Sequence, residues 1–184
     1  METADRLWTE RGFDAVTVSD LCREAGVSKG LFYFYFASKE DLLVGFVLDD
    51  ADAVAEPVER AVEANLAVEQ AIQQALAVMV RRAGQRARHL LARGIAEWFA
   101  AVERHASLAI GHTTLRDSFA RIIAHGQERG EIGSEHDPED VGGLMEWALL
   151  RAELEWATST QHQPALLDHL WSWSRIVLRG VRPA

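Results

Sequence analysis

The chain has 184 residues, 48% of them hydrophobic, and a formal net charge of −9 at pH 7. This composition indicates a globular protein with a sizeable core, and the acidic balance argues against a protein that coats nucleic acid through many phosphate contacts. The sequence contains no run of 18 apolar residues, no leader with a basic and then an apolar stretch, and one cysteine, Cys22. A membrane span, a secretory signal and an internal disulfide are therefore not expected, and a cytoplasmic location is.

Helical spacing of apolar residues runs through most of the chain, which predicts an all-α fold. A first short helix is expected at residues 3–11. Thr17 is a suitable N-cap for a second helix that stops at Gly26, and Ser28 is a suitable N-cap for a third. Two short helices joined by a tight glycine turn are the pattern of a helix-turn-helix.

Five consecutive aromatic residues, Phe32 to Phe36, would favour a β-strand if they stood alone. No partner strand is predicted nearby. On a helix, Phe32 and Phe36 share one face and can be buried, while Tyr33 and Phe34 point to the other side. The third helix is therefore expected to continue through this run.

The remainder of the chain is predicted as a series of longer helices. Ser38 caps a fourth helix that reaches about Ala55, and Pro57 is expected to mark a break or the first turn of a new helix. The stretch 126–138 is the clearest loop, with Pro138 opening the next helix. Further helices are predicted at 58–83, 86–103, 106–129, 139–159 and 164–180.

The segment TVSDLCREAGVSKGLFYFYF resembles the helix-turn-helix of the TetR family of transcriptional regulators. Gly12-Phe13 before it and Ser38-Lys39-Glu40 after it match the family as well. The resemblance implies a DNA-binding domain at 1–47 and a helical ligand-binding and dimerisation domain at 48–184. In this family another helical turn or two and a basic arm usually precede this point, which indicates an N-terminally shortened chain or a misassigned start.

A recognition helix needs small residues at its N-terminus so that its backbone can approach the major groove of DNA. Ser28, Lys29 and Gly30 meet this need, and the lysine adds a cation that can reach a base edge or a phosphate. Hydroxyl groups at the start of the second helix can donate to phosphate. The predicted DNA-binding residues are Thr17, Ser19, Ser28, Lys29, Gly30, Tyr33, Phe34, Tyr35 and Lys39.

The last two predicted helices carry apolar residues on more than one side, so that each must bury two faces. Packing against a second copy of the chain would bury the additional face in a two-fold four-helix interface. The predicted interface residues are Leu144, Trp147, Leu150, Leu154, Leu167, Leu170, Trp171 and Trp173.

The resemblance places a ligand cavity between the predicted helices in the middle of the chain. The candidate lining residues are Trp98, Phe99, His105, His112, Thr113, Arg116, Phe119 and Trp147. The histidine pairs are seven residues apart, which does not fit the i, i+4 spacing of a helical zinc site, so no metal or cofactor is expected. The arginines between 81 and 93 are interpreted as a solvated face, with binding of an anionic effector as the alternative.

These features predict a homodimeric regulator, most simply a repressor, that a small-molecule effector releases from a roughly palindromic operator. Two alternatives remain at this stage. One is a dimeric all-α interaction module with a degenerate helix-turn-helix, and the other is an all-α enzyme or carrier. The second alternative lacks support because no Ser-His-Asp or Cys-His pattern is readable in the sequence.

Overall fold

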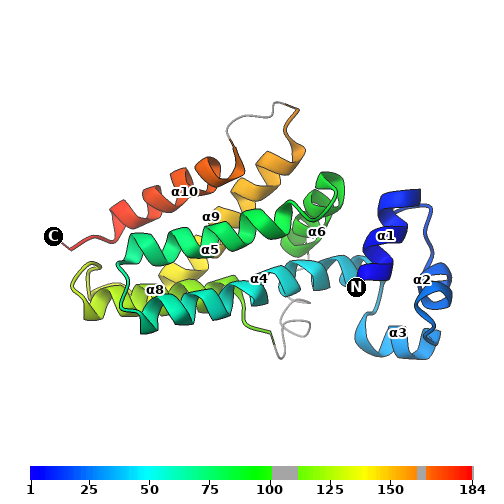
Figure 1. Ribbon diagram of the computed structural model, residues 1–184, viewed down its shortest axis with the longest axis horizontal. Coiled ribbons are helices and arrows are strands. Elements are labelled where there is room, and N and C mark those ends of the chain that lie inside the picture. Colours follow the sequence, from blue (N-terminus) through cyan, green and yellow to red (C-terminus); the bar gives the residue numbers. More distant parts are fainter. Residues whose placement is uncertain (101–111, 161–164, 184) are drawn as a thin grey trace.

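The computed structural model describes residues 1–100, 112–160 and 165–183, and all regular secondary structure in these ranges is α-helical (Figure 1). This confirms the predicted all-α class. The helices are α1 (Glu2–Arg11), α2 (Val18–Ala25), α3 (Lys29–Tyr35), α4 (Lys39–Glu63), α5 (Val68–Ala83), α6 (Arg88–Ala100), α8 (Leu115–Glu128), α9 (Pro138–Thr158) and α10 (Leu166–Gly180).

Helices α1, α2 and α3 form a small unit at one end of the molecule, beside the start of α4 (Figure 1). Its core is built around Trp8, which is fully buried, and whose ring lies 5.0 Å from the ring of Phe13 and 5.9 Å from that of Phe46. Phe32 is buried in the same core, as its helical position predicted. An aromatic cluster of this size supplies much of the apolar burial that so small a unit needs.

Helix α4 connects this unit to the larger helical body because it contributes side chains to two hydrophobic cores. Leu43 and Phe46 belong to the small core, while Val44, Val47 and Leu48 belong to the large core. Successive positions of one helix point in different directions, so a single continuous helix can serve both. The domain boundary predicted at residue 47 falls within this shared helix and stays a prediction.

The prediction that Pro57 breaks the fourth helix or opens a new one is wrong, because α4 continues through it to Glu63. Proline removes one backbone hydrogen bond and disfavours a helix interior. Beyond it, however, Val58 and Ala61 are buried in the large core, and this packing outweighs the local preference. The helix ends instead at Ala64 and Asn65, where Asn65 adopts a positive φ of 52°. The predicted helix 58–83 is therefore split by a turn before α5.

Helices α8 and α9 pack closely, and a glycine makes the contact possible. A Cβ atom at Gly142 would lie 2.5 Å from the carbonyl oxygen of Arg116 and 2.7 Å from the amide nitrogen of Ala120. Only glycine permits this approach.

Helix α8 begins at Leu115, with Thr114 as its N-cap. Residues 112–114, which the predicted helix 106–129 included, are therefore not helical. Pro138 occupies the first turn of α9, as predicted.

Candidate functional site

The turn between α2 and α3 is fixed by capping interactions at the start of both helices. The Thr17 hydroxyl oxygen accepts from the Asp20 amide at 3.2 Å, and the Asp20 carboxylate accepts from the Thr17 amide at 3.1 Å. Gly26 ends α2 with a left-handed φ of 68°. The Ser28 hydroxyl oxygen then accepts from the Leu31 amide at 3.1 Å. These bonds fix a helix-turn-helix geometry from local sequence signals.

The first turn of α3 presents Ser28, Lys29 and Gly30 to solvent. The Ser28 oxygen acts as an acceptor in its cap, which leaves its hydroxyl hydrogen for an external acceptor such as phosphate. A Cβ atom at Gly30 would meet only the Ser28 oxygen, at an ordinary 3.7 Å, so the fold does not require glycine there. A glycine without an internal reason favours close approach by an external partner. Ser19, in the first turn of α2, is half-buried.

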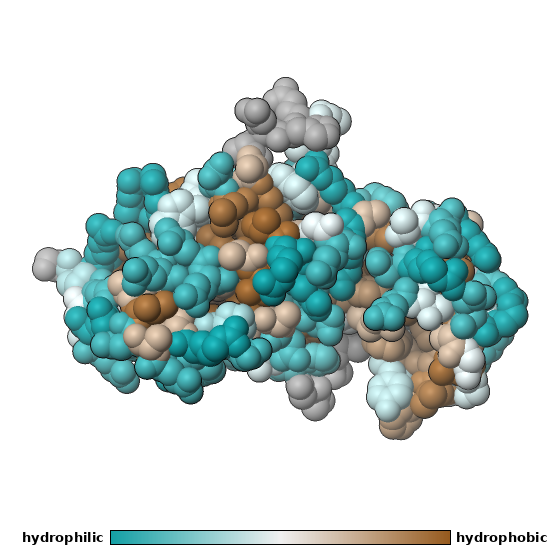
Figure 2. Space-filling view, viewed as in Figure 1, coloured by the Kyte–Doolittle hydropathy of each residue, from teal (hydrophilic) through white to brown (hydrophobic). Residues whose placement is uncertain are grey.

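Large side chains are exposed along the rest of α3. Leu31, Tyr33 and Tyr35 are exposed, and Phe34 is 79% exposed, whereas Phe32 points into the small core. In Figure 2 apolar residues appear over α3, at the lower right of the molecule. A soluble protein seldom presents so many neighbouring apolar groups without a binding function. We call the exposed residues of α3 the α3 surface.

Two of the predicted DNA contacts are engaged inside the protein. The Lys39 ammonium donates to the carbonyl oxygens of Phe13, at 2.9 Å, and Val16, at 3.1 Å, and lies 4.3 Å from the centre of the Phe13 ring. The Thr17 hydroxyl donates to the Asp20 carboxylate at 2.6 Å. Lys39 therefore ties the segment between α1 and α2 to α4, and its predicted contact with the DNA backbone stays a prediction. Thr17 is a helix cap.

The apolar residues predicted to line a ligand pocket lie in different surroundings. Trp98 and Phe119 are buried in the large core. Phe99 packs at the edge of that core, with its ring 5.0 Å from the ring of Trp147, which is itself exposed. Spacing along a helix could not separate core aromatics from pocket aromatics, because both follow the same period.

The polar pocket candidates lie at the surface. The Thr113 amide donates to the Asp52 carboxylate at 3.1 Å, and His112 Nδ1 lies 3.6 Å from the second oxygen of the same group. Arg116 pairs with Glu139 at 3.0 Å. His105 lies outside the described residues. The pocket candidates within the described residues therefore lie in different surroundings, and their role at a ligand site stays a prediction.

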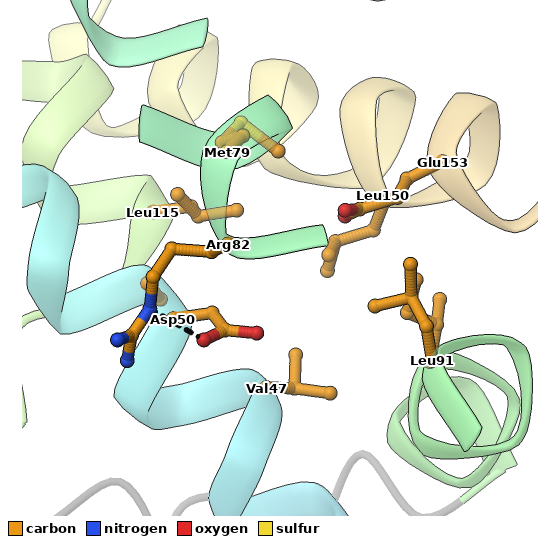
Figure 3. A pocket seen from close by; sticks show the side chains of 10 residues that line it. Val47, Asp50, Met79, Arg82, Leu91, Leu115, Leu150 and Glu153 are labelled. Carbon is orange, nitrogen blue, oxygen red and sulfur yellow. Dashed lines mark hydrogen bonds and ion pairs between the residues drawn. The ribbon is translucent and has the colours of Figure 1, made fainter. Parts of the chain in front are cut away.

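An interior cavity of about 20 Å³ lies elsewhere, between α4, α5, α6, α8 and α9 (Figure 3). It is large enough for about one water molecule or a group of similar size. Three polar side chains line it: Asp50 from α4, Arg82 from α5 and Glu153 from α9. Sequence reasoning did not select Asp50 or Glu153, and it placed Arg82 on a solvated face, whereas this side chain is largely buried and paired with acids. The other lining residues are Val47, Ala51, Met79, Leu91, Ile95, Leu115 and Leu150.

Of the charged side chains that line this cavity, Asp50 and Arg82 form ion pairs, whereas Glu153 forms none within the part of the chain that the structure describes. Asp50 accepts a hydrogen bond from Arg82 Nε at 2.7 Å and also pairs with Arg86, while Arg82 pairs in addition with Asp49. Burial raises the pKa of Asp50, against the opposing effect of the two arginines. Burial, with the nearby Asp50 charge, raises the pKa of Glu153 to about 8. The sequence signal for this site is a carboxylate among the mostly apolar buried positions of α9, which also include Glu146.

A second group of exposed apolar residues lies on α9 and α10. Leu144 and Trp147 are exposed on α9, and Ile176 is 66% exposed on α10. His169 Nε2 lies 3.4 Å from Glu155 of α9, and Trp173 and Ile176 follow His169 at four and seven residues, on one side of α10.

Glu155 follows Leu144 by about three turns, so both residues lie on the same side of α9, and Glu155 contacts His169 of α10 there. We call this side of α9 and α10 the α9–α10 surface, and it consists of Leu144, Trp147, Trp173 and Ile176. Sequence reasoning did not select Ile176.

Several residues predicted at a dimer interface are placed differently. Leu150 and Leu170 are buried within the protomer and cannot form its surface, which corrects that prediction. Leu154 is partly buried against the large core. Leu167 and Trp171 are four residues apart and share a different side of α10 from His169. The number of apolar residues in each helix could not show which side of the helix is buried within the protomer.

No helix within the described ranges is long and apolar enough to cross a membrane. The same ranges contain no group of three or more His, Cys, Asp or Glu side chains that could hold a metal ion.

These features define a helix-turn-helix protein with a second, larger helical body. The sequence profile of the bacterial regulatory proteins of the tetR family matches residues 1–45. The HTH-type transcriptional regulator UidR of Escherichia coli is 25% identical over 132 residues, which span 72% of this chain and 66% of that protein. Residues 1–45, which contain the helix-turn-helix unit, therefore match the tetR family of regulatory proteins.

Solved structures show the same fold over the whole chain. The Thermus thermophilus repressor FadR, in complex with lauroyl-CoA, has a TM-score of 0.82 at 24% identity and covers all of this chain and 94% of its own. The fatty acid degradation regulator FadR of Bacillus halodurans has a TM-score of 0.68 at 18% identity, with coverage of 98% and 97%. The arrangement of both helical units is thus that of known members of the family.

Proposed function

We propose that the protein is a homodimeric transcriptional repressor that binds operator DNA through the α3 surface and is released by a small molecule. The observation that carries this proposal is the first turn of α3, where Lys29 and Gly30 are exposed and nothing inside the fold requires the glycine. A backbone without a side chain and a single cation suit an approach to the major groove. The protein can remain acidic overall because such a footprint is small.

The α9–α10 surface supports the dimer. The large hydrophobic side chains that are exposed among the described residues fall into two groups, one on the N-terminal unit and the other on α9 and α10. A second copy packing two-fold on the α9–α10 surface would cover Leu144, Trp147 and Ile176 of the latter group and leave both α3 surfaces free. Two α3 surfaces about one DNA turn apart then read a roughly palindromic operator.

The interior cavity supports the effector. It is bordered by α4, which also contributes to the core beneath α3. A molecule that fits better when α4 has shifted would favour a dimer whose α3 surfaces no longer match the operator spacing. The molecule can change the equilibrium between the two forms of the dimer by no more free energy than the difference in its binding free energy for them.

Fluorescence anisotropy with DNA from upstream of the gene tests the proposal. Lys29→Ala should weaken binding and reduce the slope of log affinity against log salt concentration by about one. Tyr33→Ala should also weaken binding. Arg60→Ala, which removes a cation from α4 that pairs with Glu56, is the control and should leave affinity unchanged. Equal, weak and sequence-independent binding by all variants would favour an interaction module instead.

A further inference from the structure

The Glu153 side chain is a buried acid for which the structure provides no direct partner. It is only 6% exposed, and it comes from α9 to line the cavity shared with Asp50 and Arg82 (Figure 3). Within residues 1–100, 112–160 and 165–183, no hydrogen bond or ion pair reaches its carboxyl group. A buried acid without a partner is costly to the fold, and such groups are retained most readily where a ligand uses them.

The charges that face Glu153 are already balanced without it. Helix α4 contributes Asp49 and Asp50, and these pair with Arg82 of α5 and Arg86. The cavity-lining residues from α6 and α8 are apolar. An ionised Glu153 therefore adds one negative charge that no neighbouring side chain neutralises, and a ligand cation is the simplest group to neutralise it.

We propose that Glu153, together with Asp50, is the subsite for a small basic group of the effector, so that the effector is an organic cation with an apolar body. This inference rests on the proposed function, since it identifies the class of molecule that the regulator senses. An ammonium group fits a cavity of about 20 Å³, and the aliphatic side chains that line it would have to move apart to admit the adjoining carbons.

The arginines nearby do not offer a comparable site for an anionic effector. Arg82 and Arg86 are paired with acids, as described above. Arg88 stacks over the ring of Trp156 at 3.8 Å, and Arg93 pairs with Asp14 at 2.9 Å. An anion would have to displace these partners, whereas a cation meets a carboxyl group that has none.

The protonation of Glu153 gives the inference a measurable signature. Its pKa of about 8 means that the carboxyl group is mostly protonated at pH 7. An ion pair with an ammonium group requires the carboxylate, so binding at pH 7 should release close to one proton. The affinity should also rise between pH 6 and pH 8 for the same reason.

Isothermal titration calorimetry with n-hexylamine, n-hexanol and hexanoate tests the subsite, in two buffers of different ionisation enthalpy. We expect hexylamine to bind the 184-residue protein with release of about one proton, and hexanol and hexanoate to bind at least tenfold more weakly. Glu153→Gln should lower hexylamine affinity at least tenfold and abolish proton release. The control is Glu146→Gln, another buried acid of α9 that does not line the cavity, and it should bind as the wild type does.

Several results would overturn the inference: no hexylamine binding to the wild type, equal binding of the alcohol or the acid, or unchanged binding in Glu153→Gln. Circular dichroism verifies that each variant is folded. Operator binding is measured separately, with and without hexylamine. Amine binding that leaves operator affinity unchanged would remove the effector role, whereas absence of any operator binding would refute the regulator and leave the subsite intact.

Discussion

The two lysines of the chain, Lys29 and Lys39, show how one residue type takes two roles ten positions apart. Lys29 is exposed at the start of α3. Lys39 is half-buried, and its ammonium group binds two backbone carbonyls and covers an aromatic ring. A lysine count near an aromatic cluster suggests two DNA contacts, but the structure leaves only one as a free cation in this pair.

Lys39→Met should therefore lower the stability of the protein. It removes two charge-assisted hydrogen bonds and leaves the carbonyls of Phe13 and Val16 without that donor, at a cost of about 1–3 kcal/mol. Urea denaturation checks this, with Lys29→Met as the matched control that should change stability by less than about 0.5 kcal/mol. Equal stability of the two variants would mean that Lys39 is not a structural tie.

Gly30→Ala separates the requirements of the fold from those of DNA binding. Since a Cβ atom is accommodated at 3.7 Å from Ser28, the variant should be as stable as the wild type or up to about 1 kcal/mol more stable. Its operator affinity should nevertheless fall, because the added methyl group would lie between α3 and the groove. Thermal unfolding and anisotropy are measured on the same sample. Unchanged affinity would show that the α3 backbone does not approach DNA closely.

Local signals were read correctly where they act over a few residues. The capping residues Thr17, Ser28 and Ser38 each start a helix as predicted, because the cap and the amide that it satisfies are three positions apart. Asp50 and Glu153, in contrast, are about a hundred positions apart and meet only in the folded protein. No spacing rule along one helix could have predicted that site.

At the scale of the element, tertiary packing decides where α4 ends. Pro57→Ala should restore the backbone hydrogen bond to residue 53 that proline cannot donate and should stabilise the protein by about 1–2 kcal/mol. Urea denaturation measures the gain, and operator affinity should remain the same. A loss of stability would indicate that α4 needs the proline to fit the large core.

Helix α9 carries two buried acids, and both make stability depend on pH. Burial raises the pKa of Glu146 to about 7 and that of Glu153 to about 8, from 4.5. The unfolded chain thus loses these protons at lower pH than the folded protein does. Their contribution to stability is complete below pH 4.5 and is lost as the pH rises through 7 and 8.

Glu153→Gln should remove the part of this pH-dependent loss of stability that is due to Glu153. The variant and the wild type should unfold at similar temperatures near pH 4.5, and the variant should be more stable at pH 9, by an amount on the order of a few kcal/mol. Calorimetric scans from pH 4.5 to 9 provide the measurement. Parallel curves for the two proteins would show that Glu153 titrates normally and is not the desolvated acid described here.

At the scale of the whole molecule, contacts connect the interior cavity to the N-terminal unit. Arg86, which pairs with Asp50, also lies 4.5 Å from the centre of the Phe46 ring, and Phe46 packs on Trp8 of α1. A change of charge beside Asp50 therefore acts on a side chain that also contacts the small core. This provides a physical route between effector and α3, although only an α4 with two distinct positions would make it a switch.

The proposed repressor must also be a dimer, and a pair of substitutions on α10 tests this. Ile176→Glu places a charge in the α9–α10 surface, and Leu167→Glu places one on another side of the same helix, also at an exposed apolar residue. Burying an unpaired carboxylate at an interface costs several kcal/mol, so Ile176→Glu should give a monomer and Leu167→Glu a dimer. Light scattering after gel filtration measures the mass. The monomer should also lose at least tenfold in operator affinity, because each half-site would then bind alone; dimers in both cases would place the two-fold axis elsewhere.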